Sequence, residues 1–139
     1  MLERSSRLAG PATVAVGTAA LCCAVLVGNP TVPGGPLPVC PTKALLGIDC
    51  PGCGSLRMIY SLLHGDLSAA LHYNALALVA LPLLAVSFVG WAAGRWRGRR
   101  IAALAWPTWR WSPHITLVLV LAWFVIRNIP LAPFTALRV

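Results

Sequence analysis

The longest uncharged stretches of this chain decide the solvent in which it folds. No Asp, Glu, Lys or Arg lies between Arg7 and Lys43, and none lies between Asp66 and Arg95. Hydrophobic residues make up 58% of the 139 residues and charged residues only 10%. A soluble domain carries roughly 25% charged residues, and a helix of about 20 apolar residues crosses a bilayer. The composition therefore predicts an integral membrane protein.

Three apolar runs predict the fold class. We expect an all-α integral membrane protein forming a single domain over residues 1–139, with three transmembrane helices at about 11–28, 67–93 and 112–127. The first run also fits a secretory signal peptide. It is long, however, and no small-x-small cleavage site follows it, so we expect a retained helix.

A shorter helix is predicted in the loop after the first span. The apolar residues of one face repeat at i, i+3, i+4 and i+7: Leu56, Ile59, Tyr60 and Leu63. Ser55 suits the N-cap, Gly65 suits the position after the helix, and Asp66 suits the N-cap of the next helix. A helix of about ten residues is too short to span a bilayer, so we expect an amphipathic helix at the interface.

The basic residues predict the orientation in the membrane. Five arginines lie in the connection 94–111, with tryptophans beside them: Arg95, Arg97, Arg99, Arg100 and Arg110. This pattern is typical of a cytoplasmic loop that faces anionic lipid. The loop 29–66 carries two basic and two acidic residues, so we place it outside, with the N-terminus cytoplasmic and the C-terminus extracytoplasmic. No groove-reading motif accompanies the net charge of +8, so the expected partner is the lipid bilayer and not nucleic acid.

Three cysteines in the outer loop carry the strongest chemical signal. Cys40, Cys50 and Cys53 have the spacing C-x9-C-x2-C, and three uses compete. The first is a disulfide, which suits an oxidising compartment and which we favour slightly. The second is a metal such as zinc, with His64 or His72 as the additional ligand. The third is thiol redox exchange, because Cys53 precedes a helix N-terminus. No other cofactor is expected.

Glycines and an arginine beside the cysteines suggest an alternative use of the same segment. Gly52 and Gly54 open the short helix, and Arg57 lies one turn inside it, an arrangement that suits an anion such as a lipid phosphate. A membrane-edge arginine with a nearby acid is usually structural. We therefore favour an ion pair between Arg57 and either Asp66 or Asp49.

The motifs together resemble a known bacterial membrane family, domain of unknown function 2752. The resemblance is carried by the following elements: Cys40-Pro41, Gly47, Cys50-Pro51-Gly52-Cys53-Gly54, Arg57, His64-Gly65-Asp66, Ala70, Asn74 and Arg127-Asn128-Ile129-Pro130. It implies a small multi-span protein of the bacterial inner membrane, adds Asn74 and Arg127 to the candidate polar residues, and supplies no established activity.

Two positions depart from the pattern of that family. The family usually has a proline after the asparagine and a threonine two residues before the arginine, where this chain has Ala75 and Ser55. Ala75 predicts that the second transmembrane helix passes through Asn74 without a break.

The sequence favours a non-enzymatic function. It contains no paired carboxylates, no nucleophile with a base and no phosphate-cradling loop of known type, so no catalytic residue is assigned. We expect an accessory or scaffold protein whose rigid Cys-Pro-Gly loop binds a partner, either another membrane protein or a second copy of the chain. The alternative is a membrane thiol-redox or metal-binding protein that uses Cys50 and Cys53. A transporter is a weaker third class, because three spans need oligomerisation to enclose a path.

Overall fold

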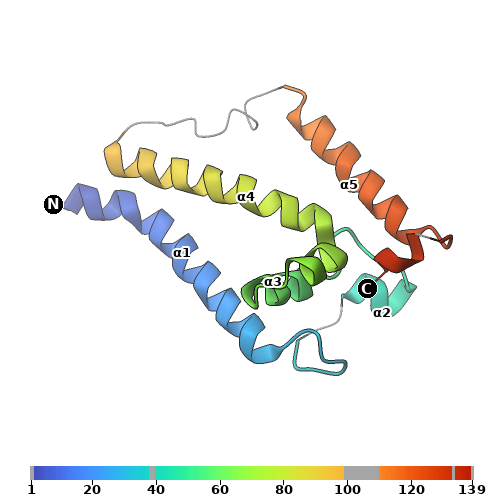
Figure 1. Cartoon of the computed structure of the whole chain (residues 1–139). Coiled ribbons are helices and arrows are strands. Elements are labelled where there is room, and N and C mark those ends of the chain that lie inside the picture. The colour runs from blue at the N-terminus through green and yellow to red at the C-terminus, as the bar shows by residue number, and fades with distance from the viewer. Residues whose placement is uncertain (1, 38–39, 99–109, 133, 139) are drawn as a thin grey trace.

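Helices account for all regular structure in the part of the chain that the computed structural model describes, residues 2–37, 40–98, 110–132 and 134–138 (Figure 1). The predicted helical class is therefore confirmed. The elements are α1 (Leu2–Gly28), α2 (Pro41–Leu46), α3 (Ser55–Leu63), α4 (Leu67–Arg97), α5 (Ser112–Asn128) and the 3-10 helix η2 (Phe134–Leu137).

Two of these helices are long and apolar enough to cross a membrane. They are Leu8–Gly28 within α1 and the whole of α4. In their most apolar windows only 11% of the α1 residues and 6% of the α4 residues are buried. A core helix of a soluble protein would be mostly buried, so this exposure agrees with helices that face lipid. The third expected span, α5, is also apolar but has only 17 residues.

Small residues let α1 and α4 pack side by side. Gly90 and Gly94 of α4 are buried, and their spacing is the small-xxx-small pattern that allows close approach of membrane helices. A Cβ atom at Gly10 of α1 would lie 3.4 Å from the ring of Trp91. The start of α1 therefore lies beside the end of α4, and Figure 1 shows the cysteine loop at the opposite end of both helices.

A short helical hairpin supports the cysteine loop. Helix α3 folds back onto the first turns of α4, as Gly65 turns the chain at φ 77° and the Asp66 side chain accepts a hydrogen bond from the Ala69 N–H at 2.8 Å. Both of these sequence predictions are confirmed. The N-cap of α3 is Gly54 at φ 81°, and Ser55 is the first helical residue, so the predicted N-cap was wrong by one position. Below the hairpin, α1, α3 and α4 meet around a small core of Val25, Met58 and Ala70.

Helix α4 breaks at Asn74, so the prediction of an unbroken helix was wrong. Asn74 has φ −161° and ψ 86°, well outside the helical region. Its Oδ1 atom accepts a hydrogen bond from the Ala77 N–H at 3.0 Å, as an N-cap does. The prediction treated proline as the residue needed for a break. The asparagine side chain replaces the lost backbone bond instead.

Two short elements were not predicted. Helix α2 begins with Pro41 directly after Cys40 and ends at Leu46, and the C-cap residue Gly47 has φ 65°. The 3-10 helix η2 follows the proline-rich segment after α5. The predicted cytoplasmic connection 94–111 begins inside α4, and Arg99 and Arg100 lie outside the described residues.

Candidate functional site

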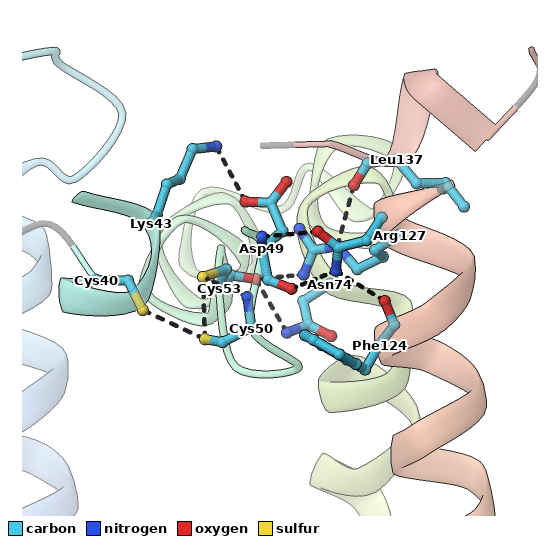
Figure 2. A network of polar contacts seen from close by, with 10 residues as sticks. Cys40, Lys43, Asp49, Cys50, Cys53, Asn74, Phe124, Arg127 and Leu137 are labelled. Atoms are coloured by element: carbon cyan, nitrogen blue, oxygen red, sulfur yellow. Dashed lines mark hydrogen bonds and ion pairs between the residues drawn. The ribbon is translucent and has the colours of Figure 1, made fainter. Parts of the chain in front are cut away.

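The fold brings the three cysteines of the loop together. Cys40 caps α2, while Cys50 and Cys53 form a tight turn before α3 in which the Cys53 N–H donates to the Cys50 carbonyl at 3.0 Å. The Sγ atoms of Cys40 and Cys50 are 3.3 Å apart, and those of Cys50 and Cys53 are 3.0 Å apart (Figure 2). All three sulfurs lie within 4.8 Å of one another.

These distances describe a triangle of free thiols. A disulfide has an S–S length of about 2.05 Å, and all three cysteines are unbonded, so the slightly favoured disulfide is absent from this structure. Nor do the sulfurs form a line. A line through Cys50 would separate the outer sulfurs by about 6.3 Å, the combined length of the 3.3 and 3.0 Å distances, and they lie within 4.8 Å. The three sulfurs therefore converge on a common centre.

The thiols of Cys40 and Cys53 lie in different environments. Cys53 is buried, with 5% of its surface exposed. Burial, together with the hydrogen bond from Cys50, raises the pKa of the Cys53 thiol to about 12. Cys40 lies nearer the surface, and its hydrogen bonds to Cys50 and Cys53 lower its pKa to about 6. Cys40 therefore loses its proton far more readily than Cys53.

The two candidate histidines do not join the cysteine triangle. The Nδ1 atom of His64 lies 2.8 Å from the Tyr60 carbonyl oxygen, and its ring stacks on Tyr60 with centroids 4.2 Å apart. His72 is exposed and meets the edge of Tyr73. Among the described residues, the group of side chains that could hold a metal consists of Cys40, Cys50 and Cys53 alone.

Asn74 and Arg127 hold the turn that carries Cys50 and Cys53. The Asn74 side-chain amide donates to the Pro51 carbonyl at 3.0 Å and the Ser55 hydroxyl at 3.1 Å. It also reaches the Cys53 carbonyl at 3.3 Å. The Nη1 atom of Arg127 donates to that same carbonyl at 2.7 Å, across 74 residues of sequence. The break in α4 thus places the Asn74 side chain where it can hydrogen-bond the cysteine turn.

Arg127 is a fully buried cation, with 0% of its surface exposed. Its Nε atom donates to the Leu137 carbonyl at 3.1 Å, and its guanidinium lies 5.6 Å from the centroid of the Trp123 ring. The Nη2 atom has no hydrogen-bond partner among the described residues. Asp49, Cys53 and Cys50 are the acidic groups close enough to act on this charge.

A second support joins α5 to the loop, and sequence reasoning did not include it in the site. The Asn128 side chain accepts from the Asp49 N–H at 3.0 Å and donates to the Asp49 carbonyl at 2.8 Å. Asp49 is buried, with 3% of the residue's surface exposed, and its carboxylate forms an ion pair with the Lys43 ammonium at 3.0 Å. Asn128 belongs to the family motif Arg127-Asn128-Ile129-Pro130. Its position directly after Arg127 was the signal that could have added it to the candidate site.

Arg57 does not form the ion pair that we favoured. Its Nε atom donates to the Pro30 carbonyl at 3.0 Å, and its guanidinium lies over the Tyr73 ring at 6.0 Å. Asp66 serves as the N-cap of α4 and Asp49 pairs with Lys43. The expected pairing was therefore wrong, because each acid is used by a residue nearer to it in sequence.

A cavity of about 460 Å³ lies between the connector after α1 and the start of α3. Cys40 and Cys53 line it, together with Lys43 and Arg57. Gly52 and Gly54, the other candidate residues of the anion site, also belong to its wall. The cysteine triangle therefore borders an open space of a size that suits a small ligand.

Comparison with known proteins confirms the family resemblance. Residues 40–88 match the sequence profile of a family described as "Protein of unknown function (DUF2752)". The matched segment begins at Cys40 and includes the whole cysteine triangle, α3, Asn74 and the middle of α4. No curated protein and no solved structure matches the chain.

Proposed function

We propose that this chain is a membrane protein whose outer loop binds a soft divalent metal, such as zinc, through Cys40, Cys50 and Cys53. The observation that carries the proposal is the triangle of free sulfurs, all within 4.8 Å of one another. Cysteine thiolates are preferred ligands of zinc, and each would lie about 2.3 Å from the ion. Modest rotation of the side chains would open the 3.0 and 3.3 Å sulfur contacts around such an ion.

The buried charge of Arg127 supports an anionic cysteine cluster, such as a metal held by three thiolates, rather than a disulfide. An unpaired guanidinium is costly to bury, and Arg127 has a free Nη2 atom and no carboxylate in direct contact among the described residues. Three thiolates on a divalent ion carry a net charge of −1. This charge offsets the cation, whereas a disulfide between two of the cysteines carries no charge.

The metal would tie the start of α2 to a turn that α4 and α5 already hold in place. Cys40 belongs to the start of α2, and the Cys50 to Cys53 turn is fixed to α4 by Asn74 and to α5 by Arg127. The loop would then be rigid. We propose that this rigidity lets the protein act as an accessory or scaffold protein that presents the loop to another membrane protein or to a second copy of itself.

We also propose that the protein has three spans in a bacterial inner membrane, with the N-terminus cytoplasmic and the cysteine loop and C-terminus outside. The arrangement in Figure 1 supports this orientation, because the end of α4 and the start of α5, where the sequence has its arginines, lie away from the cysteine loop. The third span would lie between Arg110 and Arg127, with Arg110 reaching the lipid headgroups and Arg127 buried against the loop.

Metal and thiol analysis of the full chain in detergent tests the metal proposal. We expect about one zinc per chain in the purified protein, and we expect maleimide to label Cys40, Cys50 and Cys53 only after a chelator has removed the metal. Cys50→Ser should lose the metal. Cys23→Ser, which changes an exposed cysteine of α1, is the matched control and should retain it. A wild-type chain that binds no metal and reacts fully without a chelator would contradict the proposal.

Thiol redox exchange is the second candidate function. The different environments of Cys40 and Cys53 favour it, since one sulfur is a ready thiolate and the other a protected thiol. In this reaction the Cys40 thiolate would attack an external disulfide and release its first thiol. Cys50, whose sulfur lies 3.3 Å from that of Cys40, would then displace the second thiol and close a Cys40–Cys50 disulfide. Mass spectrometry of the unreduced chain distinguishes the candidates. Redox exchange requires a disulfide that forms and breaks in a chain without metal, whereas the metal site keeps all three cysteines unbridged.

A further inference from the structure

The chain supplies three ligands where zinc takes four. His64 and His72 are placed away from the triangle, and Asp49 is held by Lys43. The residues that the structure does not describe, 1, 38–39, 99–109, 133 and 139, include no His, Cys, Asp or Glu. The fourth position of the proposed metal must therefore be filled from outside the described site.

The cavity beside the triangle is the route to that position. Cys40 and Cys53 supply two of the three sulfurs and form part of the cavity wall, while Cys50 is not part of it. The opposite wall is the proline-rich connector from Pro30 to Leu37. At about 460 Å³ the cavity has room for a small molecule as well as water.

The charge in the cavity selects the kind of ligand. Two cations line it, but the Lys43 ammonium is neutralised by Asp49 at 3.0 Å. Among the residues that the structure describes, Arg57 has no carboxylate partner, and only its Nε atom donates a hydrogen bond, to Pro30. Its two terminal amino groups donate to no other described residue, so they are available to a ligand in the cavity. A guanidinium binds anions such as carboxylates and phosphates through its paired N–H donors.

We propose that one coordination position of the metal faces this cavity and that a small anion held by Arg57 fills it. This inference rests on the proposed metal site. The loop is then a binding site for anionic ligands as well as a rigid support. Anion binding needs both the metal and the arginine.

Cobalt substitution in the full chain, purified in detergent, provides the test. Thiolate-to-cobalt charge-transfer absorption reports the three cysteines, and the d–d bands report the fourth ligand. Addition of thiocyanate should shift the d–d bands in a saturable way and leave the charge-transfer band in place. Imidazole, a neutral donor, should bind at least tenfold more weakly.

Variants of Arg57 assign the effect to the cavity. Arg57→Gln should weaken thiocyanate binding about tenfold or more, since a hydrogen bond to a charged group is lost. Arg57→Lys should restore part of the affinity. Arg110→Gln, the same change at the far end of α5, should have no effect. An unchanged charge-transfer band in each variant shows that the cysteine site is intact.

The outcomes separate this inference from the proposed function. Absence of the charge-transfer band in the wild-type chain would overturn the metal site and the anion site together. A normal band with d–d transitions that ignore thiocyanate would overturn the anion site alone. Equal affinity of the wild-type chain and Arg57→Gln, or a preference for imidazole, would overturn the role of Arg57 and of negative charge.

Discussion

The two ends of the helices use the same pair of residues, arginine and tryptophan, in opposite ways. At the end away from the cysteines, Arg95 lies 6.0 Å from the Trp91 ring and Arg110 lies 5.2 Å from the Trp111 ring, and both arginines are exposed. At the cysteine end, Arg127 lies 5.6 Å from the Trp123 ring and is fully buried. An exposed pair suits the lipid headgroups. A buried one must be compensated by its surroundings.

The difference shows that the environment of an arginine, and not its aromatic neighbour, decides its role. Water and lipid phosphates can solvate Arg110, whereas Arg127 depends on two backbone carbonyls and on the acidic groups near it. Substitutions at the two ends should therefore differ strongly in their effect on stability.

The largest effect is expected from Arg127→Gln. The change removes the donor of the Leu137 carbonyl and leaves Asn74 as the donor to the Cys53 carbonyl. It also removes the charge opposite the cysteines. The free energy of unfolding should fall by about 4 kcal/mol, in the range found when a buried charged group is removed from its partners. Denaturant unfolding in detergent micelles measures it. Metal affinity should also fall by about tenfold to a hundredfold. A loss under about 1 kcal/mol would make Arg127 no different from the exposed arginines.

Asn74→Ala should come next, with a loss of about 2 kcal/mol. It removes the cap on Ala77 and the three donations to the cysteine turn. Asn74→Asp separates these roles, because the carboxylate keeps the cap but cannot donate to the Pro51 and Cys53 carbonyls. If the aspartate variant were as stable as the wild type, the cap alone would explain why Asn74 is buried.

Asn128→Ala should cost about 1 kcal/mol, because it breaks the paired hydrogen bonds with the Asp49 backbone. Its effect should add to that of Arg57→Gln, which acts on the connector, but not to that of Arg127→Gln, which loosens the same end of α5. A double-mutant cycle in the same unfolding assay measures this. Full additivity with Arg127→Gln would show that the two residues anchor α5 independently.

The smallest effect is expected from Arg110→Gln at the opposite end. The side chain is exposed, so the free energy of unfolding should change by less than about 0.5 kcal/mol. Thermal unfolding beside Arg127→Gln gives the direct comparison. A loss as large as that of Arg127→Gln would mean that both ends hold their arginines in the same way.

Much of the helical layout could be predicted from local signals. The apolar runs predicted α1, α4 and α5, while Gly65 and Asp66 marked the turn between α3 and α4. Such signals lie within a few residues of the element that they specify. Asn74 shows their limit. A single asparagine in an apolar helix is compatible with continuation, and its break is stabilised by the Pro51 and Cys53 carbonyls more than 20 residues away.

The sequence by itself determined that the chain is helical, that two of its helices are long and apolar enough to span a membrane, and that the segment beginning at Cys40 holds the motifs of a family of unknown function. These properties depend on composition and short-range periodicity. Only the tertiary structure decided that three thiols form a triangle, that Arg127 is buried beside it and that Arg57 faces a cavity without an acid. Each of these depends on contacts between residues far apart in the chain. Whether a charge is solvated or buried is fixed only when those segments meet.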